Sequence, residues 1–236
     1  MTAAEPKRFA FAHRGGAHGP ENRLQTFVDA LARGADGLES DAWVTADGAV
    51  VLDHDGVVGT RGRGRQPISQ VRRDQLPAHV PTLDELYEAC GTDFVLAIDV
   101  KSPVIAAAVA AVAGNFDAAQ RLWVVAPHSA HLEAVDLGAA QRAVTVRGEV
   151  MRSWRRRVVL PQMKAAGVEA INARWMWWTS AMVRQVHDLG LLAFGYDTQR
   201  EVSLRRCFRI GLDGVFSDHV ERMLTARAEA AADHPV

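Results

Sequence analysis

Reactive side chains gather at the ends of the first apolar segments of this chain. They are His13, Arg14, Glu39, Asp41, His54, Asp99 and Lys101. Residues two apart in a strand point the same way, so Glu39 and Asp41 share one face, and Asp99 and Lys101 share another. Burying unlike charges costs several kcal/mol per ion unless the ions are paired or bound to a metal. A functional site is therefore favoured over solvated acids paired with Arg14 and Lys101, because structural ion pairs seldom recruit two histidines as well.

These side chains suit chemistry on a phosphodiester anion. Such an anion repels nucleophiles, so a catalyst must neutralise its charge, orient the attacking oxygen and protonate the departing one. The carboxylates supply hard oxygen ligands, which favour one divalent cation, Mg²⁺ or Ca²⁺, over zinc. Arg14 and Lys101 can complete the neutralisation on the phosphate. His13 and His54 can serve as general acid and general base, since imidazole titrates near the working pH.

Short β-rich runs alternate with longer helical patterns, which is typical of parallel strands joined by helical crossovers. Candidate strands cover residues 9–13, 36–43, 94–100, 121–126, 142–147, 168–172, 191–196 and 213–217. Candidate helices cover residues 22–33, 82–90, 103–113, 130–137, 156–166, 179–189, 200–210 and 218–230. A doubly wound sheet is the alternative, but no glycine-rich phosphate loop opens the first helix. We predict the α/β class and a single (β/α)8 TIM barrel domain over residues 1–236.

A barrel of this kind places its chemistry at the carboxyl ends of the strands, where the reactive residues fall. His54 is reached through a short hairpin, Val44 to Asp53, that turns at an Asp-Gly pair. A small insertion is expected after the second strand, at about residues 55–80, and in it Arg61, Arg63 and Arg65 alternate with glycines. Their charge could attract a phosphodiester, or the stretch could be a solvated flexible loop.

Several motifs resemble those of the glycerophosphodiester phosphodiesterase family, within the superfamily of phosphatidylinositol-phosphodiesterase-like barrels. The motifs are His13-Arg14-Gly15-Gly16, Pro20-Glu21-Asn22, Gly34 to Asp41, Thr45 to Gly48, His54-Asp55, Pro81 to Leu86, Asp99-Val100-Lys101 and Gly211 to Asp218. The resemblance spans about residues 9–222 and is looser from about 115 to 190. It implies hydrolysis of a glycerophosphodiester to sn-glycerol 3-phosphate and an alcohol.

The resemblance also implies a division of labour among the reactive residues. The two histidines act as general acid and base, the carboxylates hold one divalent cation, and the arginine and lysine bind the phosphate. The neighbouring hydroxyl of the glycerol attacks, and water later opens the cyclic phosphate. Which histidine is the acid stays open. Glu21 and Asn22 are expected to organise the loop that carries His13 and Arg14, with Asn22 as a cap of the first helix.

Departures from the family pattern bear on the substrate. Asp99 stands where the third metal ligand is usually Glu, and with Lys101 it is similar to the sphingomyelinase D and lysophospholipase D branch. Phospholipase D-like action on lysophospholipids or sphingomyelin-type substrates is therefore the second hypothesis, and a non-catalytic phosphate-binding relative is the third. Trp175, Trp177 and Tyr196 are candidate substrate contacts, with packing against the next helix as the alternative for the tryptophans.

Composition and charge point to a small-molecule substrate. Of 236 residues 48% are hydrophobic, and 27 basic against 28 acidic residues give a formal net charge of −1. That balance argues against broad binding to nucleic acid and against stable association with an anionic membrane surface. Cys90 and Cys207, the only cysteines, are expected to be reduced, and the first residues lack an apolar stretch of signal-peptide length. We expect a cytoplasmic protein, and the sequence marks no oligomer interface.

Overall fold

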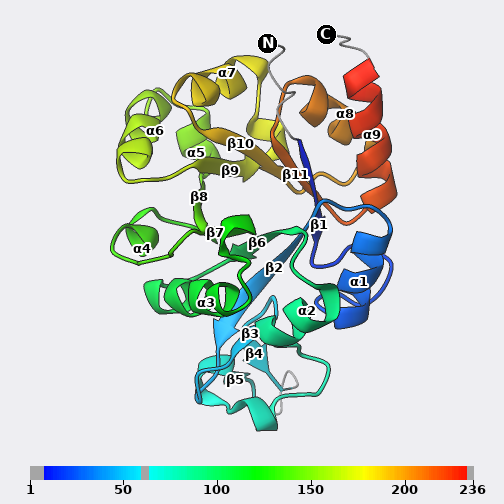
Figure 1. The fold of residues 1–236 in the computed structure, drawn as a ribbon. Coiled ribbons are helices and arrows are strands. Elements are labelled where there is room, and N and C mark those ends of the chain that lie inside the picture. The colour runs from blue at the N-terminus through cyan, green and yellow to red at the C-terminus, as the bar shows by residue number, and fades with distance from the viewer. Residues whose placement is uncertain (1–7, 60–63, 233–236) are drawn as a thin grey trace.

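Eight parallel strands form a closed barrel in the computed structural model of this protein, which describes residues 8–59 and 64–232 (Figure 1). They are β1 (Phe9–His13), β2 (Gly37–Val44), β6 (Val95–Asp99), β7 (Leu122–Ala126), β8 (Gln141–Thr145), β9 (Ala170–Arg174), β10 (Leu192–Tyr196) and β11 (Gly214–Ser217). Neighbours follow the order β1, β11, β10, β9, β8, β7, β6, β2, and pairing of β1 with β2 closes the ring. The predicted α/β class and TIM barrel are confirmed.

Helices cover the outside of the barrel (Figure 1). They are α1 (Leu24–Ala32), α2 (Leu83–Cys90), α3 (Pro103–Asn115), α4 (Ala130–Glu133), α5 (Gly148–Met151), α6 (Arg156–Ala165), α7 (Ser180–Asp188), α8 (Glu201–Arg209) and α9 (Val220–Ala232). Their buried faces and the outer faces of the strands form one large apolar cluster. A second cluster, which includes Phe11, Trp123 and Phe194, fills the inside of the barrel. The wall that carries the site is therefore packed on both faces.

Helix starts and stops follow local hydrogen bonding, which the sequence predicted in part. The backbone N–H of Glu85 donates to Thr82 Oγ1 at 3.0 Å, and the Glu85 carboxylate accepts from the Thr82 N–H at 2.7 Å, so the predicted capping box opens α2. The helix predicted over 130–137 ends at Glu133. There the Asp136 carboxylate accepts the N–H of Gly138 at 2.9 Å, a local turn that competes with the helix.

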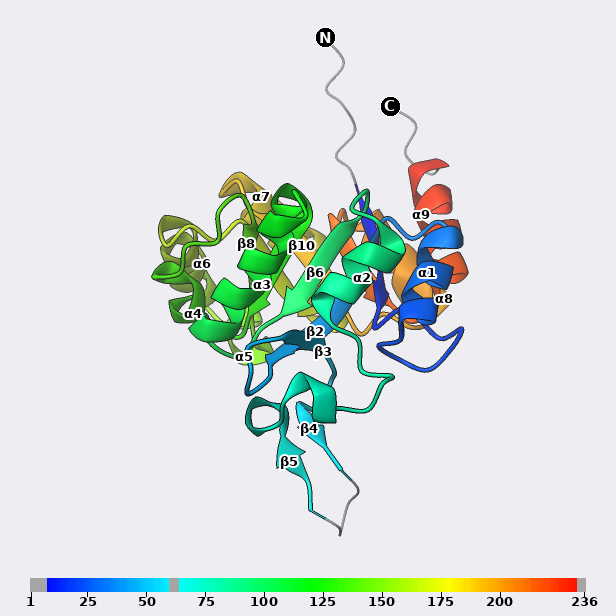
Figure 2. The ribbon, with the colours of Figure 1, turned by 60° about the horizontal axis from the view of Figure 1, so that its bottom comes forward.

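The segment after β2 leaves the barrel and projects from the end where the strands finish (Figure 2). It contains β3 (Val50–Leu52), β4 (Val57–Val58), β5 (Gln66–Pro67) and 3₁₀ turns at Ile68–Gln70 and Arg73–Gln75. β3 pairs antiparallel with β2, as the predicted hairpin requires. A small apolar cluster that includes Val51, Ile68 and Val80 packs beneath the insertion. Two further 3₁₀ turns lie at Ala119–Arg121 and Trp175–Trp177.

No helix within residues 8–59 and 64–232 is long and apolar enough to cross a membrane.

Candidate active site

A cavity of about 310 Å³ opens at the carboxyl ends of the barrel strands. It is lined by His13, Arg14, Glu39, Asp41, His54, Asp99, Lys101, Thr145, Asn172, Tyr196 and Phe216. The residues predicted to carry out catalysis, phosphate binding and metal binding therefore surround one space. Strand register sets their heights, since His13 of β1 is paired with Glu39 of β2, and Asp41 is paired with Asp99 of β6.

The carboxylates on β2 are buried beside two cations. Glu39 and Asp41 are only 7% and 5% exposed. Lys101 Nζ lies 2.7 Å from Asp41 Oδ1 and 3.7 Å from Asp99 Oδ2. Arg14 Nε lies 3.9 Å from Asp41 Oδ2. Both cations thus approach Asp41, whereas Glu39 and Asp99 receive less compensation.

The pKa values of the carboxylates reflect this uneven sharing of charge. Burial raises the pKa of Glu39 to about 8 against the opposing charge of His13, and Asp41 and Asp99 add to the rise. Burial also raises the pKa of Asp99 to about 6 against the opposing charge of Lys101. The nearby cations therefore do not offset the burial of either carboxylate, and a bound divalent cation would add the positive charge that favours their ionised forms.

The donor chemistry fits a hard divalent cation, although the donors are not drawn together. Glu39, Asp41 and Asp99 offer the oxygen ligands that Mg²⁺ and Ca²⁺ prefer. Among the residues that the structure describes, no three His, Cys, Asp or Glu side chains converge as a preformed metal-ligand group. Lys101, which contacts both Asp41 and Asp99, would compete with a cation shared by these carboxylates.

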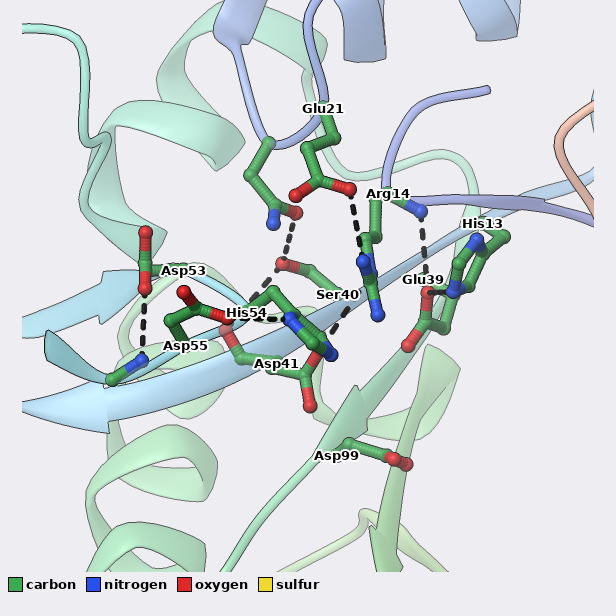
Figure 3. A network of polar contacts seen from close by, with 12 residues as sticks. His13, Arg14, Glu21, Glu39, Ser40, Asp41, Asp53, His54, Asp55 and Asp99 are labelled. Atoms are coloured by element: carbon green, nitrogen blue, oxygen red, sulfur yellow. Dashed lines mark hydrogen bonds and ion pairs between the residues drawn. The ribbon is translucent and has the colours of Figure 1, made fainter. Parts of the chain in front are cut away.

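The imidazole of His13 is fixed by an acid that follows the last strand. His13 Nδ1 lies 2.6 Å from Asp218 Oδ1, and His13 Nε2 lies 3.8 Å from Glu39 Oε2 (Figure 3 shows the Glu39 side). Burial lowers the pKa of His13, but the hydrogen bond to Asp218 and the charge of Glu39 outweigh burial and raise it. The same hydrogen bond lowers the pKa of Asp218. Gln199 Oε1 accepts the backbone N–H of Asp218 at 3.0 Å, which holds the acid in place.

The sequence patterns did not predict Asp218 as a partner of His13. The two residues are 205 positions apart and become neighbours only because β1 pairs with β11. One signal was available. An acid directly after the last predicted strand must lie beside the end of the first strand if the barrel closes.

Arg14 is held in an unusual backbone conformation next to His13. Its φ is 49°, in a region that residues other than glycine seldom adopt. The backbone N–H of Arg14 donates to the Glu39 carbonyl at 2.9 Å and to the Glu39 carboxylate at 3.2 Å. Arg14 Nη1 donates to Glu21 at 2.9 Å, and Figure 3 shows the contacts of Arg14 with these two carboxylates. Arg14 Nε is buried and has no hydrogen-bond partner within the described chain. Its nearest acid is Asp41, whose Oδ2 lies 3.9 Å away, beyond hydrogen-bond distance.

Asn22 contacts the same loop but does not cap the helix. Asn22 has a φ of 54°, its N–H donates to the Arg14 carbonyl at 3.0 Å, and its Oδ1 accepts from Ser40 Oγ at 2.8 Å. α1 begins after Arg23, whose side chain makes no capping bond. The prediction of a cap at Asn22 is wrong, because the amide ties the loop to β2 instead.

A second histidine reaches the cavity from the hairpin. Trp43 Nε1 donates to the Asp53 carbonyl at 2.7 Å, and the Asp53 carboxylate accepts the N–H of Gly56 at 2.9 Å. Gly56 has a φ of 66°, and a Cβ there would lie 2.4 Å from the Trp43 ring, so only glycine lets the chain pass. His54 Nδ1 lies 2.9 Å from Asp55 Oδ1 (Figure 3). Asp55 therefore orients His54 much as Asp218 orients His13.

One arginine of the predicted triplet joins this side of the site. Arg65 Nη2 lies 2.9 Å from Asp55 Oδ2. Arg61 and Arg63 lie outside the described residues. Two explanations were given for the triplet, attraction of the substrate and a solvated loop. The structure therefore does not test either explanation at Arg61 or Arg63.

The aromatic candidates separate into one cavity residue and a packed group. Tyr196, at the end of β10, lines the cavity. Trp175 and Trp177 pack on the outer apolar cluster, and neither is among the residues that line this cavity in the described chain. The Trp177 ring covers Gly148 so closely that a Cβ there would lie 2.5 Å from it. Trp178 is fully buried and donates to the Phe194 carbonyl at 2.9 Å.

Comparison with known proteins places the chain among phosphodiesterases. The profile of the glycerophosphoryl diester phosphodiesterase family matches residues 13–222. A glycerophosphodiester phosphodiesterase from Caldanaerobacter subterraneus is 23% identical over 92% of this chain and 97% of its own length. The structure of a glycerophosphodiester phosphodiesterase from Thermotoga maritima gives a TM-score of 0.81 with 20% identity, covering 93% of this chain and 98% of the other.

A further structure holds the product of the reaction. It is a phosphodiesterase from Oleispira antarctica in complex with sn-glycerol-3-phosphate, with a TM-score of 0.78 and 19% identity over 93% of this chain and 96% of the other. The family profile extends from His13, the first cavity residue, to beyond Asp218, the acid that holds it. The chain therefore belongs to the glycerophosphoryl diester phosphodiesterase family, whose members are phosphoric diester hydrolases.

Proposed function

We propose that this protein hydrolyses glycerophosphodiesters to sn-glycerol 3-phosphate and an alcohol, with one divalent cation and two histidines. The observation that carries the proposal is the common cavity. Two histidines, two cations and three carboxylates from separate segments line one space of about 310 Å³. Family membership adds the substrate class, and the neighbour from Oleispira antarctica carries the expected product.

The metal would be Mg²⁺ or Ca²⁺, held by Glu39, Asp41 and Asp99. When bound, it would neutralise phosphate charge in the transition state and favour an alkoxide-like oxygen. The raised pKa values of Glu39 and Asp99 support this assignment, because burial of these carboxylates outweighs the charges of His13 and Lys101 beside them. Lys101 would then exchange its contact with Asp41 for one with the substrate.

Arg14 and Lys101 would bind the phosphate. Arg14 lines the cavity, and its Nε makes no hydrogen bond within the described chain, although it lies 3.9 Å from Asp41 Oδ2. Burial lowers the pKa of Lys101, but Asp99 and Asp41 outweigh burial and raise it, so the ammonium stays charged. Both residues therefore present fixed positive charge where negative charge develops in the reaction.

His13 and His54 would transfer the protons. Each ring binds an acid through Nδ1, Asp218 for His13 and Asp55 for His54, and this leaves Nε2 for proton transfer. One histidine would take the proton of the attacking glycerol hydroxyl, and the other would protonate the departing alcohol. Water would then open the cyclic phosphate with the two roles exchanged.

The experiment is turnover of sn-glycero-3-phosphocholine, with choline and sn-glycerol 3-phosphate assayed separately. We expect both products with Mg²⁺ or Ca²⁺ and neither in excess chelator. His79→Ala is a matched control for the cavity histidines, because His79 is exposed and outside the cavity. Full activity in excess chelator would overturn the proposed metal dependence. Binding of the diester without turnover would indicate a non-catalytic relative.

A second candidate is phospholipase D-like action on lysophospholipids. The observation that favours it is Asp99, a shorter acid than Glu, whose carboxylate lies 3.7 Å from Lys101. The same assay with lysophosphatidylcholine decides between the two. Choline release from the lysolipid at a higher kcat/KM than from sn-glycero-3-phosphocholine would favour the second candidate.

A further inference from the structure

The cavity has a second polar wall that the proposed catalytic groups do not use. We call one side of the cavity the charged wall. It is formed by β1, β2, β6 and the residues just after β1 and β6, and it comprises His13, Arg14, Glu39, Asp41, Asp99 and Lys101. The neutral wall comprises Thr145 of β8, Asn172 of β9 and Tyr196 of β10. The order of strands places β8 and β9 directly across the barrel from β1 and β2. A ligand that fills the cavity therefore touches both walls.

Asn172 is the most buried polar side chain of the neutral wall and is not satisfied. The residue is 7% exposed. Its Nδ2 donates to Thr145 Oγ1 at 3.1 Å across the paired strands, whereas its Oδ1 has no hydrogen-bond partner among the described residues. Phe194 is its register partner on β10, and Ala170 precedes it on the same face of β9. A buried amide oxygen left unpaired destabilises a fold, so its place on a cavity wall points to a donor on a ligand.

We propose that Asn172, held by Thr145, binds the terminal hydroxyl of the glycerol group of the substrate. This inference rests on the proposed function. With the phosphate on the charged wall at Arg14 and Lys101, the glycerol would extend toward Asn172. Its terminal hydroxyl donates to Asn172 Oδ1, while its neighbouring hydroxyl stays beside the phosphorus that it attacks.

The buried position of Asn172 favours the glycerol group, rather than the departing alcohol, as the part of the substrate that binds at the neutral wall. The departing alcohol varies in size and must leave to solvent, so it needs the open mouth. Arg174 and Asp197 pair at the outer ends of β9 and β10, where their side chains are 43% and 41% exposed, so this end of the two strands is open to solvent. Asn172 lies one inward-facing position deeper on β9, next to the apolar interior of the barrel. The small, invariant part of the substrate fits this deeper place.

The experiment compares two phosphocholine diesters in the metal-loaded protein. One is sn-glycero-3-phosphocholine, and the other is the propane-1,2-diol analogue, which lacks only the terminal hydroxyl and keeps the attacking one. We expect kcat/KM of the wild type to be roughly 10–100-fold lower on the analogue, because Asn172 Oδ1 then stays unpaired in a desolvated site. Equal kcat/KM on the two diesters would overturn the inference.

Variants of the neutral wall test whether Asn172 causes the preference for sn-glycero-3-phosphocholine over the analogue. Asn172→Leu removes the acceptor at similar volume, so the ratio between the two diesters should fall to about 3-fold or less. Asn172→Asp keeps an acceptor at the same place, and it should lower both rates through its charge while retaining the ratio. Thr145→Val should reduce the ratio by a few-fold only, because it frees the Asn172 amide to turn. An unchanged ratio in Asn172→Leu would assign the preference to another residue and overturn the inference.

Two outcomes separate this inference from the function on which it rests. A wild type that hydrolyses neither diester would overturn the proposed function and this inference with it. A wild type that hydrolyses sn-glycero-3-phosphocholine without preferring it to the analogue would overturn the inference alone. If Asn172→Leu does not fold, the affinity of the wild type for sn-glycerol 3-phosphate against propane-1,2-diol phosphate decides, with equal affinity as the contrary result.

Discussion

The two walls of the cavity differ in how they hold polar groups. On the charged wall, ionised groups of opposite sign lie beside one another, and the pKa values of Glu39 and Asp99 are raised to about 8 and about 6 by burial. On the neutral wall, a buried amide oxygen of Asn172 lacks a partner in the described chain. On the proposed function, this difference means that one wall would act through charge in the transition state, whereas the other would recognise a neutral group of the substrate.

The same contrast appears in how the walls are supported. Glu39 and Arg14 are joined through backbone and side-chain hydrogen bonds, and His13 is held by Asp218. Asn172 is held only by Thr145 among side chains of the described chain, at 3.1 Å. Changes on the charged wall should therefore alter rates on every substrate, whereas changes on the neutral wall should alter the choice between substrates.

The largest effect is expected from removal of the metal. Excess chelator should abolish turnover, and Mg²⁺ or Ca²⁺ should restore it, because no protein cation can replace the lost charge. Metal binds the ionised carboxylates, so affinity should fall as the pH falls from about 8 toward about 6, through the pKa values of Glu39 and Asp99. Calorimetric titration across this range would measure it, and a pH-independent affinity would contradict the assignment of these ligands.

The next largest effect concerns the two proton carriers. His13→Ala and His54→Ala should each lower kcat by about 10²–10⁴-fold with the fold intact. The double variant should lose little more than the worse single variant, since both act in one proton-transfer cycle. Steady-state kinetics with His79→Ala as control would measure this. Losses that multiply in the double variant would mean that the histidines act independently.

A smaller effect is expected at the acid behind His13. Asp218→Asn should lower kcat by roughly 10²-fold, because a neutral amide no longer stabilises the charged imidazole. The hydrogen bond to Asp218 helps to raise the pKa of His13, so the limb of the pH–rate profile that belongs to His13 should move to lower pH. Asp218→Glu should restore part of the rate. A profile that does not move would show that Asp218 only supports the fold.

The smallest effect is expected at the edge of the charged wall. Asp99→Glu restores the ligand length that is usual in the family, so metal affinity and turnover of sn-glycero-3-phosphocholine should stay within about 10-fold of the wild type. Asp99→Asn is the control and should weaken metal binding. A large loss in Asp99→Glu on every diester would instead support a repositioned ion of the phospholipase D-like kind. Unchanged metal affinity in Asp99→Asn would remove Asp99 from the ligands.

The sequence was sufficient to predict most of the charged wall and most of the fold. Each strand of the barrel lies within two residues of its predicted bounds, because a run of apolar β-formers between helical patterns is a local signal. His13 and Asp99 end their strands and Glu39 lies within β2, and titratable residues in such apolar runs are unusual enough to be noticed. The hairpin that delivers His54 also depends on a local turn.

Other parts of the site depend on contacts that no local pattern contains. Asp218 faces His13 only after the ring of strands closes. Asn22 resembled a helix cap, but tertiary contact with Ser40 determines its side chain. β9 was predicted two residues early, so Asn172 was placed at the end of the strand, and an asparagine there does not differ from one in an ordinary turn. Neutral recognition residues carry no charge pattern that would single them out.

The closure of the barrel by β1 and β11 has a consequence for the newly made chain. Every residue of the charged wall is synthesised within the first half of the sequence, yet the acid that orients His13 is attached to the last strand to leave the ribosome. An incomplete or truncated chain that ends before β11 would carry all the charged groups and still lack an aligned proton carrier. On the proposed mechanism, such a chain would therefore lack hydrolytic activity until synthesis of the barrel is finished.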